Sequence, residues 1–197
     1  MVMIMEIQLL IDSFIKSITS YLQVFGIPFG CFLIILESII PVLPLGVFVA
    51  FNMMAFGNLI GFIMSWICTI IGCLLSFWFF RNIISKKFGD KLNKSPKIKK
   101  IINVVKNIKF SNLVLIVALP FSPAFLINIA CGLANVDFKK FLVSLLIGKI
   151  SIIYFWGFIS KSLFESITDI KTLITISILL LISYLISKFV NKKLRIE

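Results

Sequence analysis

The side chain best suited to chemistry is a single acid inside a long apolar run. Glu37 is the only charged residue between Val24 and Phe56. If this run lies in a bilayer, an ionised group near its centre costs on the order of 3 kcal/mol, so such a group normally faces a cavity, a partner or a substrate. We therefore predict a titratable carboxylate on a transport path. The alternative is a carboxylate near the interface that caps a helix.

Three further polar side chains lie in apolar runs. Lys149 is the only basic residue within 141–160, and it can pair with Glu37, meet a phosphate, or snorkel toward the headgroups on its long stem. Asn52 and Asn128 each follow a pair of prolines, where unwound backbone needs hydrogen-bond partners. We expect all four residues to line the path, with structural support as the alternative for the two asparagines.

The residues that most enzymes use are missing or scattered. The chain has no histidine, which removes the commonest general base and metal ligand. Its four cysteines lie in apolar runs at spacings that fit no zinc site. The sequence has no nucleophile–base pair and no glycine-rich phosphate loop. We therefore expect no enzyme activity, no cofactor and no metal.

Composition indicates that these side chains are positioned in a membrane. The hydrophobic residues make up 60% of the 197 residues, and the mean hydropathy is +1.11. A soluble globular chain is usually 45–50% apolar, and a small domain leaves much of its surface in solvent. The solvent that suits this surface is lipid. We predict an all-α integral membrane protein, because a helix satisfies its own backbone hydrogen bonds in lipid.

The net charge of +12 is concentrated in one stretch. Ten basic residues lie between Arg81 and Lys109 against one acid, Asp90, and a smaller basic cluster ends the chain. Basic loops between apolar spans follow the positive-inside rule, so loop 82–109 and the C-terminus are expected to be cytoplasmic. Within this loop, apolar residues recur at helical spacing from 98 to 108, which is typical of a basic amphipathic helix on anionic headgroups. Nucleic acid is not expected, because no groove-reading motif accompanies the charge.

The apolar runs predict the order of the elements. About 20 apolar residues cross a bilayer, and two prolines three residues apart break a helix. About three to four spanning helices are expected, with spans at 58–80, 141–160 and 172–187. Residues 1–23 are predicted to form an amphipathic helix in the interface, a poor spanning helix being the alternative. The runs at 24–56 and 110–136 are predicted to be re-entrant hairpins.

The two hairpins resemble each other. Each contains a proline pair as its tip, a later glycine, and then a long apolar helix. The first would enter from outside and the second from inside, which gives two opposed hairpins in inverted repeats. The tips are Pro41, Pro44, Pro120 and Pro123, and the glycines expected to allow close helix packing are Gly57, Gly61, Gly72, Gly132 and Gly148.

These motifs resemble those of the DedA/VTT-domain proteins, also called the SNARE-associated Golgi protein family. The first hairpin signature is Glu37-Ser-Ile-Ile-Pro41-Val-Leu-Pro44. The next helix is similar through Gly57-xxx-Gly61 and Gly72-xxxx-Phe77-xxx-Arg81, followed by Gly89. The second hairpin matches through Pro120-Phe-Ser-Pro123, Asn128, Gly132-Leu133, Phe141 and Gly148, in the form of the Golgi-vesicle-protein-like branch. The resemblance covers residues 25–160, and the Ile, Lys and Asn content is typical of an AT-rich bacterium.

The resemblance implies two opposed re-entrant hairpins and a role in moving lipids, with Glu37 as the acid of the first hairpin. It also implies a membrane domain at 24–160. The apolar run and the basic cluster that follow predict a C-terminal spanning helix and basic tail at 161–197. Where the family often has a second acid, this chain has Leu45-Gly46-Val47, and where it often has arginine, this chain has Val117, Ala118 and Pro123.

Three hypotheses about function follow. The first is a phospholipid or polyprenyl-phosphate flippase or scramblase in the plasma membrane. The second is a proton- or cation-coupled transporter of a small solute, and the third is a scaffold that transports nothing. The expected partners are membrane lipids, with anionic headgroups at loop 82–109. Whether the chain forms a homodimer is left undecided by the sequence.

Overall fold

Helices make up the regular structure of the chain. The computed structural model describes residues 2–40, 45–85, 87, 102–122, 124–165 and 170–193, and no strand occurs among them. This confirms the predicted all-α class. The elements are α1 (Val2–Ile39), α2 (Leu45–Phe56), α3 (Asn58–Phe79), a π-helical turn η1 (Phe80–Ile84), α6 (Phe110–Ala118), α7 (Ala124–Leu133), α8 (Phe138–Glu165) and α9 (Ile170–Lys193).

Three described helices are long and apolar enough to cross a membrane. They comprise 58–84, 138–163 and 170–193, with 27, 26 and 24 residues. At 1.5 Å per residue each is about 36–40 Å long, which exceeds the roughly 30 Å hydrocarbon core. The three predicted spans are therefore confirmed. The first extends beyond its predicted end at residue 80, because η1 continues α3 into the predicted loop.

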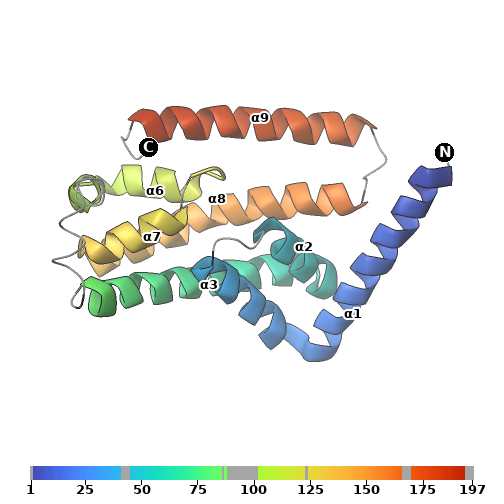
Figure 1. Ribbon diagram of the computed structural model, residues 1–197, viewed down its shortest axis with the longest axis horizontal. Helices are drawn as coiled ribbons and strands as arrows, with labels where there is room; N and C mark the ends of the chain where they lie inside the picture. Colours follow the sequence, from blue (N-terminus) through green and yellow to red (C-terminus); the bar gives the residue numbers. More distant parts are fainter. Residues whose placement is uncertain are drawn as a thin grey trace.

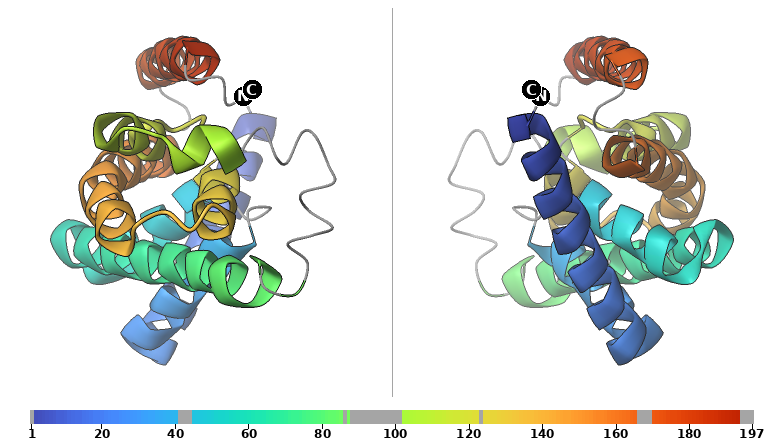
Figure 2. Two further views of the ribbon diagram at one scale, coloured as in Figure 1. Left: turned by 90° about the vertical axis from the view of Figure 1, so that its left-hand side faces the viewer. Right: turned by 90° about the vertical axis from the view of Figure 1, so that its right-hand side faces the viewer.

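The first helix is sharply bent at Gly26. This residue has φ 72° and ψ −172°, a combination that is essentially restricted to glycine. Pro28 follows, and its ring removes one backbone donor. Residues before the bend run obliquely to the long helices across one end of the molecule (Figure 1, Figure 2). Residues after it turn back toward the middle of α3.

Two helical segments are broken near the middle of the molecule. The second half of α1 ends there and α2 leads back, while α6 arrives from the opposite end and α7 returns (Figure 1). With 12 and 9 residues, α2 and α6 are about 18 and 14 Å long, roughly half the thickness of a hydrocarbon core. Leu119 before Pro120 is extended at ψ 130°, as steric conflict with a following proline requires. Pro41, Pro44 and Pro123 lie outside the described residues.

The two halves of the chain interlock. The second half of α1 packs on α3, and α6 packs on α8, so each arriving helix contacts the long helix of its own half. The returning helices cross over, because α2 also packs on α8 and α7 packs on α3. The largest buried cluster includes Phe77 and Phe141, whose rings stack with centroids 4.5 Å apart. Among the described helices, α9 lies to one side of the others, and most of its apolar side chains are exposed (Figure 2).

Four of the predicted packing glycines lie at close helix contacts. A methyl group at Gly72 would be 2.5 Å from Cβ of Ser38, and one at Gly132 would be 2.6 Å from the backbone oxygen of Phe77. Gly61 and Gly148 are also crowded, with the nearest atoms at 2.5 and 2.9 Å. The predicted packing role of Gly57 is wrong, because a methyl group there would meet nothing within 4 Å. Gly57 is instead the single residue between α2 and α3, and the chain turns there through its backbone angles of φ 84° and ψ 159°.

The predicted amphipathic helix of the basic loop differs from expectation where it is described. Residues 102–106 are helical, but Val105 and Ile108 are buried in the main core, so this apolar face packs on protein and not on headgroups. Lys106 and Lys109 are exposed. The rest of the predicted helix, including residues 98–101, lies outside the described residues.

Candidate functional site

Glu37 lies in the last turn of α1, near the middle of the molecule. Its side chain is partly buried. The neighbouring Ser38 donates its hydroxyl to the backbone oxygen of Ile34 at 3.0 Å and lies 3.5 Å from Oε2 of Glu37. Ser38 is pressed against Gly72 of α3. Since Gly72 is 14 residues from the start of α3, or about 21 Å, the acid lies near mid-span and not at an interface.

Lys149 lies at a similar depth on α8. It is 11 residues from Phe138 and 14 from Leu163, or about 17 and 21 Å from the two ends of the span. Its side chain is only 4% exposed, so it is held inside the protein and does not snorkel to the headgroups. Its positive charge acts on the carboxylate of Glu37. The structure thus places at a similar depth an acid and a base that are separated by more than one hundred residues of sequence.

The close approach of these elements depends on two small residues. Gly72 lets α1 contact α3 beside Glu37, and Gly148 lets α8 contact α6 beside Lys149. At Gly148 a methyl group would be 2.9 Å from Cγ1 of Val117 and 3.1 Å from the backbone nitrogen of Ala118. Each member of the charged pair therefore adjoins a broken segment. Sequence reasoning missed Ser38, although a serine directly after a lone acid is a detectable signal.

Asn52 does not join this pair. It is buried, and its amide donates to Oγ of Ser65 at 3.2 Å and to the backbone oxygen of Gly30 at 3.5 Å. Gly30 is seven residues before Glu37 on the same helix, about 10 Å away. Asn52 thus joins α1, α2 and α3 by hydrogen bonds. These bonds agree with the structural alternative foreseen for the asparagines.

Asn128 is separate again. It lies on α7 with 2% of its surface exposed, and its Oδ1 has no hydrogen-bond partner. Ser76, on the facing helix α3, is buried with a hydroxyl that also lacks a partner. A buried polar atom without a partner costs about 1–3 kcal/mol. Both α3 and α7 therefore carry a buried polar atom without a hydrogen-bond partner among the described residues.

The site combines an acid and a base with broken backbone. At membrane depth, non-helical backbone persists only where protein or a water-filled cavity covers it. An acid and a base in such a place can bind a charged group of either sign or exchange a proton. The arrangement suits a binding or transport site, since both groups are positioned by rigid helices.

Comparisons with known proteins agree with this architecture. The VTT domain family model matches residues 40–162, which includes both returning helices and most of the two long helices they contact. The chain is 29% identical over 176 residues to the uncharacterized membrane protein YhjE of Bacillus subtilis (strain 168), covering 89% of this chain and 84% of YhjE. It is 26% identical over 126 residues to the uncharacterized protein YqeD of the same organism, covering 64% and 61%. No solved structure matches the chain.

Proposed function

The chain belongs to the VTT-domain family of membrane proteins, and we propose that it moves lipids across the plasma membrane as a phospholipid or polyprenyl-phosphate flippase or scramblase. The observation that carries this proposal is that Glu37 and Lys149 both lie in the interior near mid-span. The centre of a bilayer is where the headgroup of a crossing lipid is least stable. A charged pair at that depth offers the headgroup polar contacts where lipid offers none.

The broken segments supply the route in this proposal. They enter the membrane from opposite sides as re-entrant hairpins, because each limb is too short to cross it. The end of α1 carries the acid and the end of α6 adjoins the base, both near the midplane, where paired broken helices of transporters commonly form their binding sites. Lys149 binds the phosphate of the headgroup, and Glu37 binds an amine or a proton. Metals and cofactors have no part in this route.

The orientation follows from charge. The ends of α3 and α9 and the beginnings of α6 and α8 lie together at one end of the molecule (Figure 1). Arg81 donates to the backbone oxygen of Val136 there at 3.3 Å, and Lys140 donates to that of Ile108. Lys192 and Lys193 end α9 at the same side. By the positive-inside rule this end is cytoplasmic.

The test is translocation of a fluorescent phospholipid in liposomes, followed by dithionite quenching. Wild type should allow quenching of both leaflets, whereas Glu37→Gln should quench only the outer one. The matched control is Asp137→Asn, which neutralises an exposed acid. Asp137 accepts a hydrogen bond from the backbone of Lys140 at 2.8 Å, and asparagine caps helices equally well. Equal translocation by wild type and Glu37→Gln removes the pair from the mechanism.

A proton- or cation-coupled transporter of a small solute is a second candidate, because the same acid can bind the coupling proton or cation. It predicts no phospholipid transfer by wild type, together with solute uptake that follows an imposed pH gradient. A scaffold predicts neither activity, and it predicts effects from lysine substitutions in 82–109 alone.

A further inference from the structure

The least buried of the three described spans, α9, forms one wall of a groove of about 560 Å³, called the α9 groove below. Buried residues make up 11% of the most apolar window of α9, against 50% and 44% in the spans at 58–84 and 138–163. The helix therefore packs only sparsely on α8 and on the break between α6 and α7 (Figure 1, Figure 2). Six side chains line the groove between these elements: Phe121, Trp156, Ser177, Leu180, Leu181 and Tyr184.

Aromatic rings from three elements meet in the α9 groove. The ring of Phe121, in the α6–α7 break, lies edge-on to that of Trp156 on α8, with centroids 5.8 Å apart. It lies edge-on to the ring of Tyr184 on α9 as well, at 5.9 Å. Leu181 is 59% exposed and Tyr184 is 47% exposed, so the groove is open to the side. In a membrane this opening faces acyl chains.

A basic residue lies at the end of the groove nearer the basic loop. Lys188 is exposed, and its Nζ lies 6.0 Å from the centre of the Tyr184 ring. Because Tyr184 lines the groove, the charge is directed toward the groove. A ring attracts an ammonium group through its face, and the ammonium has three donors. Lys188 can therefore bind an anion and stay beside Tyr184.

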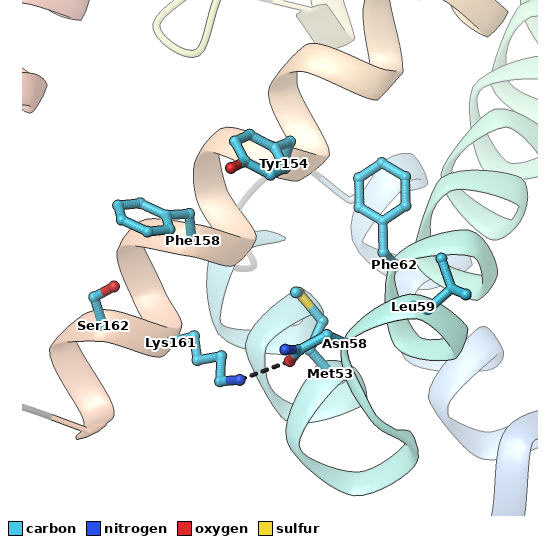
Figure 3. A pocket seen from close by; sticks show the side chains of 8 residues that line it. All are labelled: Met53, Asn58, Leu59, Phe62, Tyr154, Phe158, Lys161 and Ser162. Atoms are coloured by element: carbon cyan, nitrogen blue, oxygen red, sulfur yellow. Dashed lines mark hydrogen bonds between the residues drawn. The ribbon is translucent and has the colours of Figure 1, made fainter.

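A groove of similar volume on another side of α8 differs in this respect. It lies against the start of α3, and Figure 3 shows the side chains that line it. Its lysine, Lys161, donates to Oδ1 of Asn58 at 2.6 Å (Figure 3). A headgroup there would compete with a protein acceptor for the ammonium, whereas the described neighbour of the Lys188 ammonium is a ring.

Buried polar side chains continue the same face of α9 beyond the groove. Ser187 and Asn191 follow Tyr184 at helical spacing, and each is 1% exposed. The hydroxyl of Ser122, next to Phe121 in the break, donates to Oδ1 of Asn191 at 3.1 Å. Nδ2 of Asn191 and the hydroxyl of Ser187 have no hydrogen-bond partner among the described residues. Since unpaired buried donors are unfavourable, this polar contact is suited to an acceptor from outside the protein.

The dimensions of the region match one leaflet. Lys188 is five residues, or about 8 Å, from the end of α9 at Lys193. Ser177 is 11 residues, or about 16 Å, deeper along the helix. Half of a hydrocarbon core is about 15 Å thick. The lysine is therefore near the level where headgroups meet acyl chains, and the groove runs from there to about the midplane.

We propose that the α9 groove binds a lipid with an anionic headgroup from the leaflet on the side of the basic loop. Lys188 and the donors of Ser187 and Asn191 bind the phosphate, and one chain lies along Tyr184 and Phe121. The headgroup reaches the two buried donors when α9 moves away from the break, which its sparse packing allows. Lys188 selects anionic lipids, because a zwitterionic headgroup carries no net charge. This inference rests on the proposed function, for which the groove is an entry beside the second broken segment.

The test is site-specific labelling of the full-length protein by a lipid. The protein is placed in vesicles of phosphatidylglycerol and phosphatidylcholine with a trace of phosphatidylglycerol that carries a photoactivatable diazirine on one chain, and cross-linked residues are identified by mass spectrometry. Wild type should be labelled at 177–184 and at Phe121. A phosphatidylcholine probe should label these residues about fivefold less, and Lys188→Gln should lower labelling by the phosphatidylglycerol probe about fivefold, the effect of one basic residue on binding to anionic lipid. Lys193→Gln is the matched control, because it removes the same charge about 140° around the same helix.

A second set of variants tests the groove and the polar contact. Ser177→Phe fills the groove and should abolish labelling, whereas Thr175→Phe should leave it unchanged, because Thr175 is exposed and does not line the groove. Both hydroxyls donate to the carbonyl four residues before them, so the two variants lose an equivalent bond. Ser187→Ala should lower labelling without loss of stability, because the hydroxyl has no partner to lose among the described residues.

The outcomes separate the groove from lipid transport. Equal labelling by the two probes, or equal labelling of wild type and Lys188→Gln, overturns the groove as an anionic-lipid site, whatever the translocation assay shows. Cross-links from the groove to a second copy of the chain in place of lipid also overturn it. Selective labelling without translocation by wild type keeps the groove and overturns lipid transport. Glu37→Gln should be labelled normally, because Glu37 does not line the groove.

Discussion

Replacing Gly61 with alanine places a methyl group where α2 leaves no space for it. The new carbon would be 2.5 Å from the backbone oxygen of Asn52, 2.5 Å from Cα of Met53 and 2.6 Å from the backbone carbon of Asn52. Carbon atoms in proteins pack at about 3.5–4.0 Å. The helices must therefore separate by about 1 Å, and the obstacle is backbone, which cannot change rotamer to give way.

The movement has further costs, because α2 is held on its other side. Gly157 of α8 packs against Met53 and Val49, and Asn52 donates to Ser65 and Gly30. Moving α2 away from α3 stretches these hydrogen bonds and compresses the contact with α8. Overpacking of a filled interior costs 1–3 kcal/mol. We expect about 3 kcal/mol for Gly61→Ala, at the upper end, because neither neighbour can yield.

The assay is reversible unfolding in mixed micelles with increasing SDS, followed by circular dichroism. The matched control is Gly157→Ala, which makes the same chemical change toward the same helix. Its methyl group would meet Sδ of Met53 at 2.7 Å and Cγ1 of Val49 at 3.0 Å, which are side-chain ends. A flexible thioether can move, so we expect about 1 kcal/mol. If Gly61→Ala is no more destabilising than Gly157→Ala, the argument from backbone contact is wrong.

Three further predictions use the same unfolding assay. Gly57→Ala should cost about 1–3 kcal/mol because the turn needs a backbone conformation that other residues rarely adopt, and a change below about 0.5 kcal/mol would contradict this. Lys149→Met should destabilise the wild type more than the Glu37→Gln variant, with a coupling of about 0.5–3 kcal/mol, the range found for neighbouring charged groups. Additive effects would show that the two charges do not interact. Asn52→Leu should cost about 1–3 kcal/mol through the lost hydrogen bonds to Ser65 and Gly30, yet the folded variant should still translocate lipid, and a folded but inactive variant would return Asn52 to the path.

Several features follow from the sequence alone because their causes are local. The three spans depend on the length of an apolar run, which can be counted. The breaks depend on proline, whose ring restricts its own residue and the one before it, as the extended Leu119 shows. The isolation of Glu37 in an apolar run marked it as exceptional before any partner was known. The family could also be recognised from the order of these motifs.

Which side of each helix faces protein and which faces lipid was decided by tertiary structure. In water, the apolar face of a helix is the buried one, but lipid tails are as apolar as a leucine, so hydrophobic pattern does not separate the protein-facing side from the lipid-facing side. Val105 and Ile108 therefore looked like a membrane-binding face and lie in the core. Lys149 looked able to snorkel and is buried.

Contacts between residues far apart in the chain could likewise not be predicted from the sequence. The crossing of α2 to α8 and of α7 to α3 brings Lys149 to the same depth of the interior as Glu37 and brings Lys161 to Asn58. Each of these pairs joins residues about one hundred positions apart, and neither residue carries a local signal of the other. Sequence determined which segments enter the membrane and where they break, because sterics and apolar length act within a few residues. Only the packing of the two halves decided which polar side chains meet.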